Sequence, residues 1–318
     1  MPIRTSRLAS VLATLLLTLL AGCAVQPIHG DRDGSLPRRA ELEATPFFPQ
    51  EIDHCGPAAL ATTLVAAGID TTPEALAPSV FLPARKGSLP LDVIGGARRA
   101  GALAVRVAPT LDALLGLVRD GHPVVVLQNL GLSWYERWHY AVVVGHDLDR
   151  REIVLRSGRT RREVLSIFTF DHTWARSGRW ALLVLAPGTA PPPGVEVGPY
   201  TDAALALERL GNLPAAQAAY RAGHERWPDD IPLAIGLGNT AYAQGDLDAA
   251  EAALRAAAKA HPASDVVLNN LAHVLMERGR FDEAEALAQR AVDLAGPKLE
   301  IARATLADIR AKRDSTSR

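Results

Sequence analysis

The chain has 318 residues, of which 48% are hydrophobic and 22% charged, and its 34 Lys and Arg nearly balance its 35 Asp and Glu. This length and apolar content predict two globular units. The basic pairs are short and flanked by acids, so we expect no nucleic-acid partner. The histidines follow no metal-ligand spacing, so we predict neither a metal site nor a cofactor.

The first 23 residues have the pattern of an export signal. Two arginines precede an apolar segment over residues 8–20, which is too short to span a membrane. It ends in Leu-Ala-Gly-Cys at residues 20–23, which resembles the lipobox of bacterial lipoproteins. The resemblance implies cleavage after residue 22, acylation of Cys23 and, because Ala24 is not the aspartate of inner-membrane lipoproteins, an outer-membrane anchor facing the periplasm. An ordinary secreted protein is the alternative.

Composition divides the rest of the chain. Residues 23–46 are rich in charge, Pro and Gly and predict a linker, and the proline-rich stretch 187–196 predicts a second, semi-rigid linker. The segment between them, 47–186, forms the first predicted domain. Cleavage of the signal removes two arginines and leaves 32 basic against 35 acidic side chains, a net charge of −3.

The C-terminal part repeats itself every 34 residues. Glycines and alanines recur at this period, at Gly211, Gly245 and Gly279 and at Ala216, Ala250 and Ala284. The pattern resembles the tetratricopeptide repeat, which implies three pairs of antiparallel helices over 197–298 and a capping helix and tail over 299–318. The repeats imply a protein partner, self-association or a spacer. No aromatic or charged stripe stands out at the concave positions.

The first domain mixes helices and strands. Helices are predicted over 58–67, from residue 73 after an N-capping threonine, over 90–100 and over 110–119. Strands are predicted over 103–107, 123–128, 138–145, 152–157 and 179–185. Helices followed by an antiparallel meander predict an α+β domain.

Cys55 carries the first sign of chemistry. Gly56 and Pro57 indicate the start of a helix, so the thiol lies at a helix N-terminus, where partial positive charge favours the reactive thiolate. The amide of Gln50, just upstream, is placed to donate a hydrogen bond to an oxyanion. Acylation of Cys23 would leave one further cysteine in the chain, which favours a chemical role for it. A buried structural cysteine is the alternative.

His139 is the second sign. It opens a predicted strand after the aromatic loop 134–138, so a rigid element holds an imidazole that can act as general base for a thiol. Gln50, Cys55 with its glycine, and the run His-Tyr-Ala-Val-Val-Val-Gly at 139–145 resemble the papain-like cysteine peptidases, most closely the bacteriocin-processing (double-glycine leader) peptidase family, over about residues 46–186. The resemblance implies a papain-like α+β fold and acyl-enzyme chemistry on a peptide or other amide. It also implies a nucleophilic Cys55, His139 as base and then acid, and Gln50 as oxyanion donor.

The third catalytic group departs from that family. The family places an aspartate at the end of the next strand, where this chain has Ser157. A hairpin turning near Leu148 would place Ser157 opposite His139, so its hydroxyl is the predicted orienting group. Asp147 lies roughly 26 Å along a straight strand from His139 at about 3.3 Å per residue, which is too far. A hydroxyl stabilises an imidazolium less than a carboxylate does.

Three functions stay open at this point. The first is a thiol hydrolase, a peptidase whose repeats recruit a substrate or partner. The second is a periplasmic scaffold in which the peptidase fold has lost activity and the repeats act alone. The third is acyl transfer to an amine, as in transglutaminase-like relatives.

Overall fold

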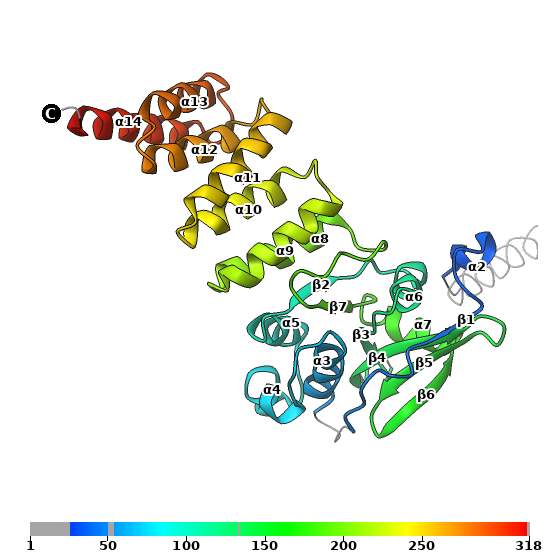
Figure 1. The fold of residues 1–318 in the computed structure, drawn as a ribbon. Helices are drawn as coiled ribbons and strands as arrows, with labels where there is room; N and C mark the ends of the chain where they lie inside the picture. Colours follow the sequence, from blue (N-terminus) through cyan, green and yellow to red (C-terminus); the bar gives the residue numbers. More distant parts are fainter. Residues whose placement is uncertain (1–25, 50–53, 133, 317–318) are drawn as a thin grey trace, which may run out of the picture.

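The computed structural model describes residues 26–49, 54–132 and 134–316. Figure 1 shows an N-terminal part built around a β-sheet and a helical array that extends away from it to the C-terminus. Within the described ranges, no helix has the length and apolar character needed to cross a membrane.

The N-terminal part has a sheet of seven strands among the described residues, in the order β2-β7-β3-β4-β5-β6 with β1 paired to β4. Its neighbouring strands are antiparallel. The strands are β1 (Arg39–Glu41), β2 (Leu103–Arg106), β3 (Val124–Asn129), β4 (Trp138–Asp147), β5 (Glu152–Ser157), β6 (Thr160–Ser166) and β7 (Ala181–Leu185). Strands β3, β4 and β5 are neighbours in chain order, as the predicted meander requires, and β6, which was not predicted, extends it. The prediction of a simple meander is wrong for β7, which returns between β2 and β3.

Helices cover both faces of this sheet. On one face lie α3 (Cys55–Ala66), α4 (Pro73–Val80) and α5 (Pro90–Arg99), and on the other lie α6 (Leu111–Arg119) and α7 (Ile167–Ala175). Side chains of a strand alternate between faces, so Val142 packs with α3 while Val143 packs on the opposite side. Burial on both faces explains why the central strands are continuous apolar runs.

Two predicted helix starts have the expected caps. The hydroxyl of Thr72 accepts a hydrogen bond from the backbone amide of Ala75, and that of Thr110 accepts one from Ala113. Each cap satisfies an amide of the first turn that has no partner inside its own helix.

The segment predicted as a linker, 23–46, is part of the fold over its described residues. It contains α2 (His29–Asp33) and β1, which pairs with the far end of β4. The buried guanidinium of Arg156 donates to the backbone carbonyls of Leu42, Glu43 and Thr45. The linker prediction is therefore wrong here, because a strand at this position needs only backbone pairing and one buried cation, neither of which composition reveals.

The C-terminal part consists of antiparallel helix pairs. Its helices are α8 (Val197–Arg209), α9 (Leu213–Arg226), α10 (Ile231–Ala243), α11 (Leu247–Ala260), α12 (Asp265–Glu277), α13 (Phe281–Asp293) and α14 (Leu299–Thr316). The three periodic glycines have positive φ angles of 77°, 80° and 71°, in the left-handed region that a helix end requires. The periodic alanines are fully buried between helices.

The two parts share a hydrophobic core. Tyr200 and Leu207 of α8 belong to the same buried cluster as Leu103 and Val105 of β2. The stretch 187–196 contains neither helix nor strand. The first helix pair is therefore packed against the sheet as well as joined to it by that stretch.

Candidate active site

A cleft of about 1310 Å³ opens at the end of the sheet where β4 begins. Cys55 and His139, which are more than eighty residues apart in the sequence, both line it. Other walls come from the loop before α5, from Leu127 at the end of β3 and from the turn between β5 and β6. The structure thus brings the two predicted chemical groups to one concavity.

Cys55 is the first residue of α3, as predicted, and 7% of its surface is exposed. The preceding residue, His54, stacks on Phe81 with ring centroids 4.4 Å apart. The helix packs closely on the loop before α5, since a Cβ at Gly56 would lie 2.3 Å from the side-chain oxygen of Ser88. Glycine is therefore required for this loop to close the cleft beside the thiol.

His139 lies at the start of β4, opposite Gln128 of β3. Its Nε2 lies 2.9 Å from the hydroxyl oxygen of Ser157, which is 7% exposed. Burial lowers the pKa of His139 below the ordinary value of 6.5, and the nearby carboxylate of Glu163 on β6 partly opposes this shift. The ring is thus held neutral at neutral pH.

The His139–Ser157 contact arises by a different route from the one predicted. The register places Arg156 opposite Val142 and Leu155 opposite Val143, with a bulge before Gly145. If the same pairing is extended toward the start of β4, residue 159 and not Ser157 lies opposite His139. The predicted register is therefore wrong. The chain turns after Leu148 through Arg151, whose φ is +56°. The hydrogen bond is therefore a diagonal contact between neighbouring strands.

Asp147 does not join this contact, as its distance along the strand predicted. Asp147 lies at the far end of β4, where its carboxylate accepts from Arg39 at 2.9 Å and lies near Arg150. It cannot orient His139. Gln50 and Cys23 lie outside the described residues.

Sequence reasoning assigned no role to two groups, Tyr140, which lines the cleft, and Arg156, which lies outside its lining. Tyr140, buried on the α3 side of β4, donates its hydroxyl to the carbonyl of Ser88 at 3.3 Å. Burial raises the pKa of Tyr140, and so does the negative charge of nearby Cys55 when it is ionised. Arg156 is the other, since it fixes the segment that leads toward Cys55. Its position beside Ser157 in the sequence was the available signal.

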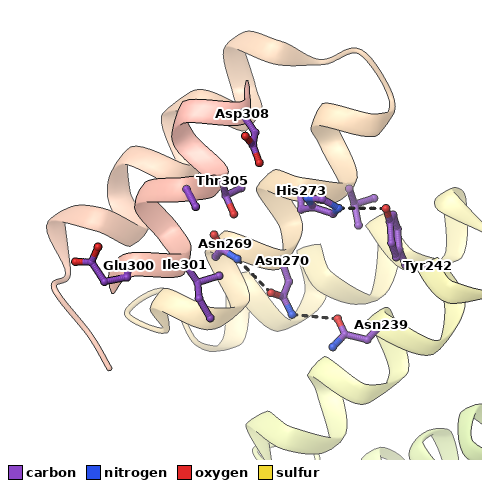
Figure 2. A pocket seen from close by; sticks show the side chains of 11 residues that line it. Asn239, Tyr242, Asn269, Asn270, His273, Glu300, Ile301, Thr305 and Asp308 are labelled. Carbon is purple, nitrogen blue, oxygen red and sulfur yellow. Dashed lines mark hydrogen bonds between the residues drawn. The ribbon is translucent and has the colours of Figure 1, made fainter. Parts of the chain in front are cut away.

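A second concavity, of about 560 Å³, lies in the helical array between α10, α12 and α14. Figure 2 shows Asn270 donating to Asn239 at 3.0 Å and Tyr242 paired with His273 at 3.1 Å. Asn269 also lines it and is 8% exposed, and its Oδ1 accepts no hydrogen bond from the described residues. The expectation from the sequence concerned only aromatic or charged stripes at the concave positions and did not consider neutral asparagines, which do not share the 34-residue period.

Comparison with known proteins bears on both parts. The family model for the tetratricopeptide repeat matches residues 201–265 and 235–298. Among solved structures, one described as a C39-like peptidase from Bacillus anthracis is 18% identical, with a TM-score of 0.40 over 46% of this chain and 97% of that one. No curated protein matches the sequence.

Other solved structures resemble the helical array. The Yersinia enterocolitica type III secretion chaperone SycD with a YopD peptide is 22% identical, with a TM-score of 0.33 over 36% of this chain and 92% of that one. The first tetratricopeptide domain of Spaghetti (RPAP3) with an HSP90 peptide is 15% identical, with a TM-score of 0.34 over 36% and 90%. The predicted fold class, an α+β part followed by tetratricopeptide repeats, is confirmed.

Proposed function

We propose that the chain is a cysteine peptidase, anchored by a lipid on Cys23 to the outer membrane and facing the periplasm, with a tetratricopeptide module that binds a protein partner. One observation carries the enzymatic half of this proposal. A thiol at a helix N-terminus and an imidazole held by a hydroxyl line the same cleft.

The proposed reaction follows from this arrangement. When Nε2–H of His139 donates to Ser157, Nδ1 carries the lone pair that accepts the proton of the Cys55 thiol. The sulfur attacks the carbonyl carbon of an amide, and the carbonyl oxygen becomes an oxyanion that Gln50 is proposed to stabilise. His139 returns its proton to the leaving amine, and water then hydrolyses the acyl-enzyme. Because the ring is neutral, it acts as a general base and not as a preformed imidazolium.

Thiol labelling tests this chemistry. Iodoacetamide should modify Cys55 below the pH at which ordinary thiols react, and His139→Ala should slow the modification by about a hundredfold. The control is His29→Ala, because that side chain is exposed and remote from the cleft. Mass spectrometry of the peptide that contains Cys55 separates it from any reaction at Cys23. Modification of wild type no faster than that of a model thiol would reject the peptidase.

The main competing function is a scaffold that has kept the fold and lost the activity. Two observations favour it: a hydroxyl stands beside His139 in place of a carboxylate, and burial disfavours the imidazolium. A scaffold predicts slow labelling that His139→Ala does not change, together with full function of a Cys55→Ala variant in cells. Acyl transfer to an amine is a third outcome, detected by supplying an amine and measuring amide formation.

The groove of Figure 2 supports the partner half of the proposal. Its asparagine amides carry both donors and acceptors and can bond to the backbone of an extended peptide. A photocrosslinking residue at Ile301, which lines the groove and is 51% exposed, should capture the partner in cells. The same residue at Leu210, 56% exposed in the first helix pair, is the control. Equal capture at both positions would contradict binding in the groove.

The anchor is tested separately. Mass spectrometry of the mature protein should find Cys23 at the N-terminus and acylated, and Cys23→Ser should release the protein from the membrane fraction. An unacylated terminus would refute the lipid anchor without affecting the peptidase.

A further inference from the structure

The walls of the candidate active site are strongly basic. Five cationic side chains from four separate segments line the cleft, and all are exposed: Arg85, Lys86, Arg137, Arg159 and Arg176. Among the described lining residues, one carboxylate, Glu136, is present, and it accepts a hydrogen bond from the indole of Trp138 at 3.1 Å. The chain as a whole is nearly neutral, so this concentration of charge is local.

These cations are not balanced by the protein. None of the five forms an ion pair within the described part of the chain, whereas Arg38, Arg162 and Arg310 elsewhere on the surface each do. Arg176 is fixed by backbone carbonyls, since its guanidinium donates to Asn129 and Gly131. Carbonyls orient a guanidinium but leave its net charge. The positive potential is therefore available to a ligand, and a concave wall concentrates it.

The charges come from chain segments that adjoin each of the reacting groups. Arg137 precedes His139 by two positions and Arg159 follows Ser157 by two. Arg85 and Lys86 belong to the loop whose Ser88 packs against the helix that starts with Cys55. A peptide chain that enters the cleft to reach the thiol would therefore lie among these cations.

We propose that this cleft selects peptide segments rich in aspartate and glutamate around the scissile bond, an inference that rests on the peptidase function proposed above. Carboxylates match guanidinium groups in geometry as well as charge. An anionic lipid surface would be drawn to the same charges, and exposed Trp134 and Tyr135 lie nearby. The cations, however, line a concavity together with the thiol, and an extended peptide can enter it whereas a bilayer cannot.

Binding measured without turnover tests the inference. Full-length Cys55→Ala protein is titrated into a fluorescein-labelled peptide of alternating Glu and Asp, and into its Gln and Asn counterpart, with anisotropy as the readout. The acidic peptide should bind at least about tenfold more tightly, and its affinity should fall with added salt. Replacing Arg137 and Arg159 together with glutamine should weaken acidic binding by about threefold for each charge.

A matched control removes the same charge elsewhere. Arg221 and Lys259 are exposed cations on the helical array, and their double glutamine variant should bind the acidic peptide as the parent does. Equal affinity for the two peptides, or equal loss in both double variants, would overturn the inference. So would cation-dependent binding to phosphatidylglycerol vesicles without binding to the acidic peptide. Selective binding together with slow Cys55 labelling would keep the acidic selectivity and reject the peptidase.

Discussion

Replacing Ser157 with aspartate tests whether the hydroxyl beside His139 limits the chemistry of the site. Ser157 Oγ lies 2.9 Å from His139 Nε2, so a carboxylate there would face the same ring nitrogen. In the wild type, burial holds the pKa of His139 below 6.5. A folded-state pKa that is depressed means that the ring's contribution to stability is present above pH 6.5 and is lost as the pH falls through the folded pKa.

The size of the change follows from hydrogen-bond energetics. A hydrogen bond between neutral groups contributes about 1 kcal/mol net, and one to a charged group contributes about 1.5–3 kcal/mol. The carboxylate should therefore favour the imidazolium by about 1 kcal/mol more than the hydroxyl does, which corresponds to roughly one pKa unit. Because position 157 is buried, an aspartate there is tolerated only when paired with the imidazolium.

Two measurements follow. NMR titration of the His139 ring should show its pKa rising in the aspartate variant, and Cys55 alkylation should be faster near neutral pH. Ser157→Asn is the control, because asparagine is neutral and similar in size to aspartate. It should raise neither the pKa of His139 nor the rate of Cys55 alkylation. If the aspartate leaves the pKa of His139 unchanged, the contact between residues 139 and 157 does not exist in solution and the proposed orientation of the ring is wrong.

Three further outcomes are expected. Glu163→Gln removes the negative charge that raises the pKa of His139. The rate of Cys55 labelling should therefore begin to rise at a lower pH than in the wild type, and a shift to higher pH would refute the effect assigned to Glu163. Gly56→Ala forces a methyl group against Ser88 and should cost about 1–3 kcal/mol of stability by thermal unfolding, with an undiminished melting temperature contradicting the close packing. Gly236→Ala places a Cβ 2.4 Å from a tyrosine ring of α9 and should lower the melting temperature similarly while leaving Cys55 labelling unchanged; slower labelling would contradict a purely structural role.

The parts of the fold that the sequence predicts are those whose signal is local or periodic. Helix α3 begins at Cys55 as the Gly-Pro pair indicates, and the repeats follow from glycines that need a left-handed turn at a fixed period. Central strands such as β3 are predictable because burial on both faces leaves an unbroken apolar run.

The missed elements lack such a signal. Strand β6 is charged and mostly exposed, because it is at the edge of the sheet and its pairing with β5 depends on backbone groups alone. Helix α7 is rich in aromatic and β-branched residues, which have weak helix propensity, and is held by Phe170 and Trp174 in the core. Strand β1 becomes visible only through its pairing with β4.

The candidate site was predictable in its members and not in its geometry. Cys55, His139 and Ser157 are each identifiable from residue type and neighbouring pattern. Their spatial relation depends on a bulge in β4 and on the turn through Arg151, neither of which alternation of apolar residues specifies. The basic character of the cleft walls could not be predicted from the sequence either. The cations come from separate loops, and in a count along the chain their charge is balanced by acidic residues elsewhere.

The first helix pair packs against the sheet, and this packing links the proposed peptidase cleft to the proposed partner-binding groove. Tyr200 of α8 is fully buried in the cluster that also contains Leu103 of β2, so separating the parts would expose apolar surface to water. A partner held in the groove between α10, α12 and α14 is then connected to the cleft through packed helices, not through a flexible tether. Recruitment by such an array acts by placing a bound segment at a set distance from the thiol. A flexible tether would instead raise the local concentration of any segment within its reach.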